Sequence, residues 1–225
     1  FSDAPIRSSY FVKRADFIAA HNQTYIVNYD IVSELKDGGT LLLNCPWTPE
    51  ELEEKIPPEI RRELAQKHAQ FYIINATKIS GKLGLGSHVN IPLQAAFFHL
   101  VDLVPKDEAR RLLADAVKKT FFAKGDEVVA RNVASIDEGA KALVKIEIPA
   151  SWASAPDSPP KDYTGKPAIV KNLLDPINRQ QGDKLPVSAF VGYEDGTVEL
   201  GLTAYEKRAI ATFVPEWDPK KCIQC

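Results

Sequence analysis

The sequence lacks any apolar run close to the roughly 20 residues that a membrane-spanning helix needs, and it contains no signal-peptide pattern. It also lacks an excess of charge of either sign, because 28 basic residues face 30 acidic ones and leave a formal net charge of −2. Such a balance gives no electrostatic footprint for nucleic acid or for an anionic membrane surface. Three cysteines are too few for a disulfide framework. We therefore expect a cytoplasmic protein that binds neither nucleic acid nor membrane.

Two of the three cysteines, Cys222 and Cys225, stand close together at the end of the chain. Their Cys-x-x-Cys spacing suits zinc, a redox dithiol or an iron–sulfur cluster, and the spacing alone does not choose among these. A cubane cluster needs four thiolates, so this pair cannot complete such a site. No initiator methionine precedes Phe1. We therefore expect the chain to be a segment of a larger protein.

Between residues 16 and 148, short apolar runs alternate with long amphipathic stretches, a pattern typical of a layered α/β sheet. Buried strands are expected at residues 17–20, 40–43 and 71–74. Helices are expected at residues 24–36, 58–68, from 90 onward, and along the apolar stripes at 109–121 and 129–144. The sequence Asp37-Gly38-Gly39 is expected to end the first helix. The fold class is therefore α/β: a three-layer α/β/α domain with a largely parallel sheet over residues 1–150.

The composition changes beyond Pro149. Four prolines with Ser, Asp and Gly between them fill residues 151–167, which predicts an extended connector. Residues 168–203 offer one short helix and little that could form a core. We expect residues 151–203 to make a proline-rich connector and a small domain.

Residues 83–90 form the glycine-rich string LGLGSHVN, which is expected to lie between a strand and the helix that begins near Asn90. Glycines let the backbone approach a ligand closely, and free N–H groups at a helix start attract anions. A tight turn alone would explain the same residues, because the third glycine and the later acidic residue of a dinucleotide fingerprint are missing. Arg7 beside Ser8 could hold a phosphate or a carboxylate, although this is also a common loop composition. Both readings stay open at this point.

The remaining reactive residue types give no catalytic arrangement. The four histidines are scattered without the spacing of a helical zinc site. Cys45 has no base near it in sequence and is expected to be a small buried apolar residue. No Ser/His/Asp or Cys/His pattern emerges, and we assign no catalytic residue.

Several ordered strings run along the whole chain. In chain order they are RADF at 14–17, KDGGT at 36–40, the glycine string, QAAFF at 94–98, GDKLPVSAF at 182–190, YEKR at 205–208, VPEW at 214–217 and CIQC at 222–225. Together these strings resemble the middle of pyruvate:ferredoxin (flavodoxin) oxidoreductase. The resemblance implies a gamma-type α/β domain that lacks its first part, then the connecting domain. Residues 204–225 would begin a ferredoxin-like domain, truncated here.

The resemblance also implies a function. Members of this family oxidatively decarboxylate pyruvate on thiamine diphosphate with Mg, pass electrons through [4Fe–4S] clusters to ferredoxin or flavodoxin, and form acetyl-CoA from coenzyme A. They belong to anaerobic metabolism, and a homodimer is expected for the whole enzyme. The segment would contact the remaining domains, would bind no cofactor alone and would be inactive alone. The expected coenzyme A contacts are Gly84, Gly86, Ser87, Asn90, Arg7 and Ser8, and Cys222 with Cys225 would supply part of a cluster's ligands.

The chain departs from the family pattern at one point, because Gly86-Ser87-His88-Val89-Asn90 replaces the family's Gly-Gly-Arg-Ile-Asn. A cationic contact made by that arginine is therefore in doubt. The alternative function is a non-catalytic α/β binding or assembly module. Further cysteines after Cys225 at cluster spacing would favour the redox enzyme.

Overall fold

The computed structural model describes residues 4–7, 12–206 and 214–223 of the 225. Its strands and helices, in chain order, are β1 (Ala15–Ala20), α1 (Gln23–Asn28), β2 (Leu35–Asn44), α2 (Leu52–Lys55), α3 (Pro58–Gln66), β3 (Gln70–Ile74), α4 (Ala76–Lys82), α5 (Asn90–Leu100), α6 (Lys106–Phe121), α7 (Asp126–Lys141), β4 (Val144–Ile146) and α8 (Asp175–Asn178). Short 3-10 turns join several of these elements. The contacts divide the chain into two units, residues 1–162 and 163–225.

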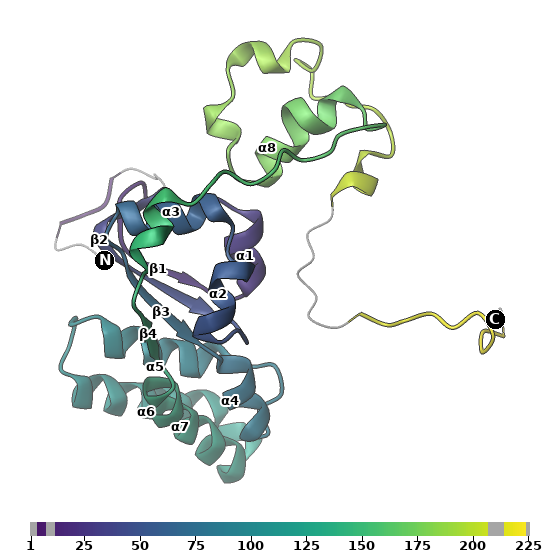
Figure 1. Cartoon of the computed structure of the whole chain (residues 1–225). Coiled ribbons are helices and arrows are strands. Elements are labelled where there is room, and N and C mark those ends of the chain that lie inside the picture. Colours follow the sequence, from purple (N-terminus) through teal and green to yellow (C-terminus); the bar gives the residue numbers. More distant parts are fainter. Residues whose placement is uncertain (1–3, 8–11, 207–213, 224–225) are drawn as a thin grey trace. The chain divides into compact units, whose positions relative to one another are not determined.

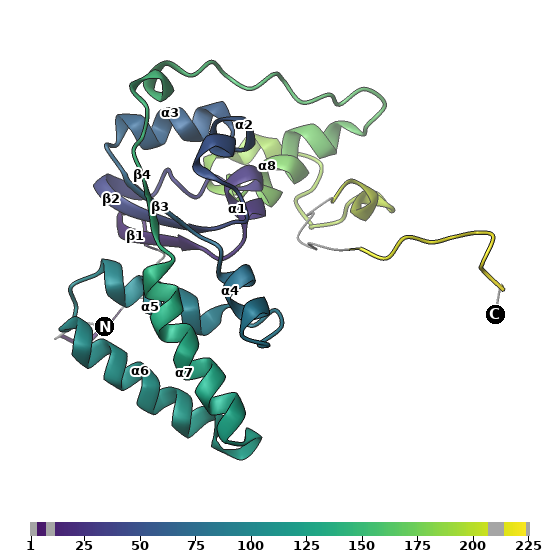
Figure 2. The same cartoon turned by 60° about the horizontal axis from the view of Figure 1, so that its bottom comes forward.

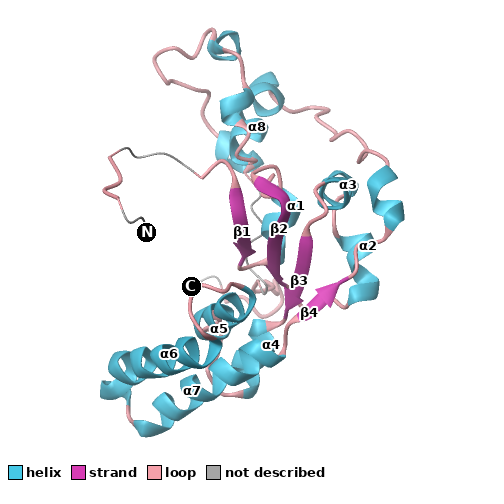
Figure 3. Ribbon diagram, turned by 90° about the vertical axis from the view of Figure 1, so that its left-hand side faces the viewer, coloured by secondary structure: helices cyan, strands magenta, loops and turns pink. Residues whose placement is uncertain are grey.

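The first unit is built on a sheet with the order β1-β2-β3-β4. The first three strands are parallel, and β4 pairs antiparallel with β3. Figure 1 shows α1, α2 and α3 on one side of this sheet and α4 to α7 on the other, and Figures 2 and 3 show the same layers from two further directions. The unit is thus a three-layer α/β/α domain with a largely parallel sheet, which confirms the predicted fold class.

Strand β2 shows why both sheet faces are covered. Successive side chains of a strand point to opposite faces. Leu41 and Leu43 accordingly join the apolar core under α1 to α3, while Leu42 joins the core under α4 and α5. All three side chains are buried. A strand that is apolar on both faces requires a helical layer on each, and burial of each leucine stabilises the fold by about 1.5–3 kcal/mol.

The predicted helix at 24–36 is wrong in length, because α1 ends at Asn28 and residues 29–34 form bends and turns. The Lys67 ammonium holds this segment by donating hydrogen bonds of 2.7–2.8 Å to the carbonyl oxygens of Val32, Ser33 and Leu35. Backbone groups held in this way do not need a helix as their partner.

The predicted role of Asp37-Gly38-Gly39 is also wrong. These residues lie inside β2, where the pairing with β1 jumps from Ala15 opposite Leu35 to Phe17 opposite Thr40. The extra residues on β2 form a bulge. Gly38 has a φ of +72°, which glycine adopts without the strain that a side chain would bring. The glycines therefore bend a strand instead of ending a helix.

Two further expectations change in the structure. The glycine string does not follow a strand directly, because α4 lies between β3 and the string. The stripe predicted to run to residue 144 belongs to α7 only as far as Lys141, and Val144 begins β4. A strand of three residues is too short to show an alternating pattern of its own. Val144 was therefore assigned to the apolar stripe of the preceding helix. The expected strands at 17–20, 40–43 and 71–74 are confirmed within β1, β2 and β3.

The second unit has a small core of four buried residues, Ile169, Val170, Leu173 and Leu202. The expected short helix corresponds to α8 and follows a π-helical turn at Val170–Leu174. The predicted domain boundaries at 150 and 203 stay predictions. Among the residues that the structure describes, no helix combines the length and apolar character needed to cross a bilayer.

Candidate functional site

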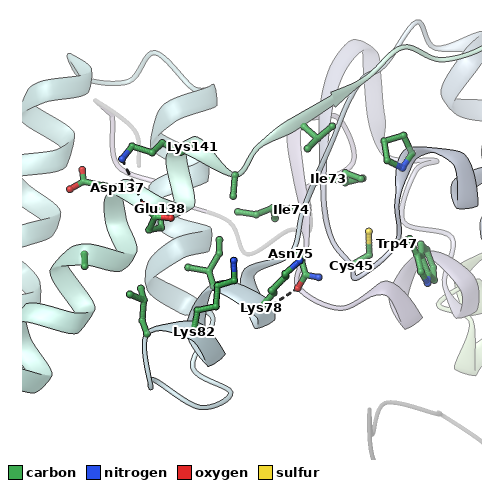
Figure 4. Close-up of a pocket in the computed structure, with 16 residues that line it drawn as sticks. Cys45, Trp47, Ile73, Ile74, Asn75, Lys78, Lys82, Asp137, Glu138 and Lys141 are labelled. Atoms are coloured by element: carbon green, nitrogen blue, oxygen red, sulfur yellow. Dashed lines mark hydrogen bonds and ion pairs between the residues drawn. The ribbon is translucent and has the colours of Figure 1, made fainter.

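A cavity of the first unit lies at the carboxyl ends of β2 and β3. Its volume is about 630 Å³, within the range of about 300–1,000 Å³ that small-molecule sites occupy. The loop after β2, the end of β3, α4 and α7 supply its walls, as Figure 4 shows. Ligands of open α/β sheets bind outside the carboxyl ends of the strands. The position of this cavity therefore marks it as a candidate site.

The wall of the cavity nearest the sheet is fixed by Asn44, the last residue of β2. Its side-chain amide donates to the His21 carbonyl at 2.9 Å and its side-chain oxygen accepts from the Ala76 N–H at 2.9 Å. Because Asn44 is buried, these two bonds are little screened and join the end of β1 to the start of α4. The next residue, Cys45, donates its N–H to the Ile74 carbonyl at 2.9 Å. The strand ends that carry the cavity are thus held together.

Cys45 lies in the cavity wall with 3% of its surface exposed. Burial raises the pKa of its thiol to about 11, with the Glu51 carboxylate adding to the rise and a backbone hydrogen bond from Trp47 opposing it. The thiol is therefore protonated near neutral pH and does not act as a nucleophile there. The expectation of a small buried residue is confirmed.

The charged groups of the cavity come from α4 and α7. Asp137 on α7 accepts two hydrogen bonds from Arg110, at 2.6 and 2.7 Å, and this contact lowers the pKa of its carboxyl. Glu138 lies 3.7 Å from the Lys141 ammonium. Lys78 and Lys82 on α4 form no ion pair with any described residue. The cavity therefore carries a surplus of positive charge along α4.

The glycine string forms a turn between α4 and α5. Leu85 N–H donates to the Ser80 carbonyl at 2.8 Å, and the Ser80 hydroxyl donates to the His88 carbonyl at 2.7 Å. Gly84 has a φ of +69°, and the Arg131 guanidinium lies 3.0 Å from the position that a side chain there would take. Gly86 has a φ of +62° with open space beside it. The two glycines thus make a structural turn, and at Gly86 the turn leaves room for a partner.

The structure does not bring all the predicted site residues together. Ser87 and Asn90 are exposed on the string, and the Asn90 side chain makes no hydrogen bond to the described part of the turn. Arg7 is exposed and forms no ion pair or hydrogen bond with the string. Ser8 lies outside the described residues. Their assignment to coenzyme A stays a prediction.

The predicted metal ligands are partly outside the structure. Cys222 is exposed, and Cys225 lies outside the described residues. Within residues 4–7, 12–206 and 214–223, no group of three or more His, Cys, Asp or Glu side chains is arranged to hold a metal ion. A thiolate suits an iron–sulfur cluster, but the described residues supply an incomplete ligand set.

Sequence reasoning missed the cavity and its lysines. Lys78 and Lys82 were available as a signal, since they stand four residues apart just after a buried strand and so share one face of the following helix. Their helix, α4, was itself missed, because its seven residues begin at the end of β3 and end at the glycine string. Asn75, which caps α4 by accepting from the Lys78 N–H at 2.9 Å, was the third available signal.

Comparison with known proteins gives consistent relatives along the whole chain. The sequence is 42% identical to a pyruvate:ferredoxin oxidoreductase of Moorella thermoacetica over 100% of the chain and 19% of that relative. It is 44% identical to a pyruvate-flavodoxin oxidoreductase of Klebsiella pneumoniae over the same shares. It is 39% identical to a mitochondrial pyruvate dehydrogenase [NADP(+)] of Euglena gracilis, covering 12% of that protein. The chain thus spans about a fifth or less of the curated relatives it matches.

A solved structure is also similar, the pyruvate oxidoreductase subunit PORC of Thermotoga maritima. The match has a TM-score of 0.48 and 20% identity, and it covers 60% of this chain and 67% of that one. A family model described as a domain of unknown function matches residues 155–211. The model described as pyruvate ferredoxin/flavodoxin oxidoreductase matches residues 1–142, well over half of the chain. The chain therefore belongs to the pyruvate ferredoxin/flavodoxin oxidoreductase family.

Proposed function

We propose that the chain is a segment of an enzyme that converts pyruvate and coenzyme A to acetyl-CoA, carbon dioxide and one proton, with two electrons passed to ferredoxin or flavodoxin. The observation that carries the proposal is the similarity over 100% of the chain to proteins named for this oxidation, at 42% and 44% identity. In such an enzyme, thiamine diphosphate with Mg would supply the decarboxylation chemistry and [4Fe–4S] clusters the electron path. We propose no thiamine ligand in this chain, and we propose that the segment alone is inactive.

Within that enzyme, we propose that the segment contributes contacts to coenzyme A and to neighbouring domains. The coenzyme A contacts are the six residues Gly84, Gly86, Ser87, Asn90, Arg7 and Ser8. The open space beside Gly86 and the exposure of Ser87 support this assignment, because a ligand can approach that backbone closely. Coenzyme A has anionic phosphates on a long neutral arm, which suits exposed N–H groups and basic side chains.

Cys222 and Cys225 are the proposed start of a cluster's ligand set. A cubane cluster requires four thiolates, so the remaining ligands would come from other parts of the enzyme. We also propose a cytoplasmic homodimer.

The test is Gly86→Val in the full-length enzyme. A valine side chain at Gly86 would fill the open space and strain a backbone with a φ of +62°. We expect the KM for coenzyme A to rise by about tenfold, equal to about 1.4 kcal/mol of lost binding. Reduction of the enzyme by pyruvate before coenzyme A is added is expected to persist, because the segment holds no proposed thiamine contact. Stopped-flow and steady-state kinetics with a viologen acceptor measure both quantities.

The matched control is Gly125→Val. Gly125 also has a positive φ, +90°, with open space beside it, but it stands between α6 and α7 instead of on the string. Gly125→Val is expected to lose at least as much stability as Gly86→Val, because a φ of +90° with a ψ of +160° is essentially restricted to glycine. Only Gly86→Val is expected to change the KM. If Gly86→Val folds normally and leaves coenzyme A kinetics at the control value, the string is a structural turn without a ligand.

A further inference from the structure

Two lysines of α4 line the cavity without an anionic partner. Lys78 and Lys82 are four residues apart on this helix, both exposed, and neither forms an ion pair with a described residue. Like charges at this spacing repel each other and destabilise a helix by about 0.2–0.5 kcal/mol. Lys141 lies across the cavity on α7 and already has Glu138 as its partner. The pair on α4 is therefore an uncompensated positive charge at the edge of a cavity.

The carboxylates of the same cavity do not neutralise the α4 lysines. Asp137 is engaged by Arg110 through two short hydrogen bonds, and Glu138 by Lys141. On the α4 side of the cavity, the side-chain polar groups available to a ligand are donors. They include the two ammonium groups and the amide nitrogen of Asn75, which makes no hydrogen bond with the described residues because the cap on α4 uses only its oxygen.

The rest of the wall is apolar. Ile74, Ile79 and Leu83 line the cavity on the side of β3 and α4, and the first two are buried by the fold. A volume of about 630 Å³ accepts a ligand larger than a bare anion. Figure 4 shows Lys78, Lys82 and Asn75 on neighbouring parts of the cavity rim, with Lys141 and the acids on the opposite helix. Donors along one side and an apolar wall beside them specify a ligand with two chemically different parts.

We propose that this cavity is a binding site for a phosphorylated small molecule with an apolar or aromatic body, of the nucleoside diphosphate class. The phosphates would lie at Lys78 and Lys82, with the Asn75 amide as a further donor, and the body would lie along Ile74 and Ile79. Lysine binds phosphate as a point charge, and a charge-assisted hydrogen bond is about twice as strong as a neutral one. The proposal does not depend on the assignment of the glycine string.

The test measures where a nucleotide protects the full-length protein from hydrogen exchange. Adenosine diphosphate and inorganic pyrophosphate at millimolar concentration are the probes, and adenosine is the uncharged control. We expect both anions to slow exchange in peptides that cover α4, with adenosine diphosphate effective at lower concentration because its body adds apolar contact. Lys78→Gln/Lys82→Gln is expected to weaken this protection about tenfold or more, since two charged contacts are lost.

The matched control is Lys118→Gln/Lys119→Gln on α6, which removes the same charge from an exposed helix that does not line the cavity. It is expected to leave the protection of α4 unchanged. The α4 double variant relieves a like-charge pair, so its melting temperature is expected to equal or exceed the wild-type value. Absence of protection of α4 in the wild type, or equal protection in both double variants, would overturn the proposal.

Competition identifies the source of the phosphate. If excess coenzyme A displaces radiolabelled adenosine diphosphate from the protein in equilibrium dialysis, the site holds the nucleotide end of that co-substrate. If the labelled adenosine diphosphate stays bound, a separate nucleotide occupies the site. Either result supports a phosphate site in this cavity, and the KM for coenzyme A of Gly86→Val remains a separate test of the glycine string.

Discussion

Single residues show how the fold controls chemistry in this protein. Cys45 would be reactive if its thiol were exposed, yet it is buried at the end of β2 and its pKa is raised to about 11 from an ordinary value of 9.0. The charged thiolate is disfavoured because the protein surroundings solvate it poorly. A raised pKa of an acid means that the protonated form persists to higher pH, so the thiol stays neutral across the physiological range.

We predict that iodoacetamide alkylates Cys45 in the folded chain at least about a hundredfold more slowly than in the urea-unfolded chain at pH 8. A thiol pKa of about 11 instead of 9.0 lowers the thiolate fraction at pH 8 by about a hundredfold, and burial adds a barrier to access. The rate should rise with pH up to about 11. Peptide mass spectrometry measures the rate, and alkylation at the unfolded rate would show that the cavity wall opens freely.

The surroundings of a residue near the site could be predicted only where its neighbours in sequence determine them. Cys45 comes two residues after the apolar run Leu41-Leu42-Leu43 and precedes a proline, which predicts burial from local sequence. Lys78 and Lys82 resemble any pair of surface lysines until α7 is placed across from them. The two lysines remain uncompensated because Asp137 and Glu138 are paired with Arg110 and Lys141. Arg110 and Lys141 lie about 30 and about 60 residues after the two lysines in sequence.

The packing of α5 against α7 depends on a close approach of the two helix backbones at one position. Gly139 on α7 is buried, and a side-chain carbon there would meet the Pro92 carbonyl oxygen at 2.5 Å and its Cα at 2.7 Å. These neighbours are backbone atoms of α5, so they cannot rotate away. Only glycine allows the two helices to lie at this distance.

We predict that Gly139→Ala lowers the free energy of unfolding by about 1–3 kcal/mol, the usual cost of overpacking. The helix preference of alanine offsets part of this loss. The matched control is Gly81→Ala on α4, where a side chain would meet nothing within 4 Å and the backbone is helical. Gly81→Ala is expected to raise stability by about 0.5–1 kcal/mol. Urea denaturation followed by circular dichroism measures both, and a stable Gly139→Ala would contradict this account of the α5–α7 contact.

Helices and strands were predicted best where they are long enough to show a clear pattern of apolar residues. The strands at the centre of the sheet were evident, because apolar runs bounded by turn residues carry their own signal. α1 was predicted too long, since Val32 and Leu35 keep helical spacing but are buried by a turn and a strand that Lys67 holds. No local pattern reports that a lysine about 30 residues later satisfies these carbonyls. β4 was missed because three residues carry no period.

At the scale of the whole molecule, the two units differ greatly in what stabilises them. The first has continuous cores on both faces of its sheet, including fully buried residues such as Leu41, Leu43 and Phe71. The second, residues 163–225, has four buried apolar residues in its described part. Regions with few buried apolar contacts open locally at low free energy. The second unit is therefore expected to be the less stable part of the chain.

We predict that backbone amides of residues 163–206 exchange with solvent at least about a hundredfold faster than those of β2 and β3 in the 225-residue chain. Tyr163→Phe tests whether the units open separately, because the Tyr163 hydroxyl donates to Asp175 at 2.7 Å entirely within the second unit. Loss of this bond costs about 1 kcal/mol, which would speed exchange about fivefold in residues 163–206 alone. Hydrogen-exchange mass spectrometry resolves the two regions. An equal acceleration in β2 and β3 would mean that the chain opens as one cooperative unit, and the contrast between the cores would then not set local stability.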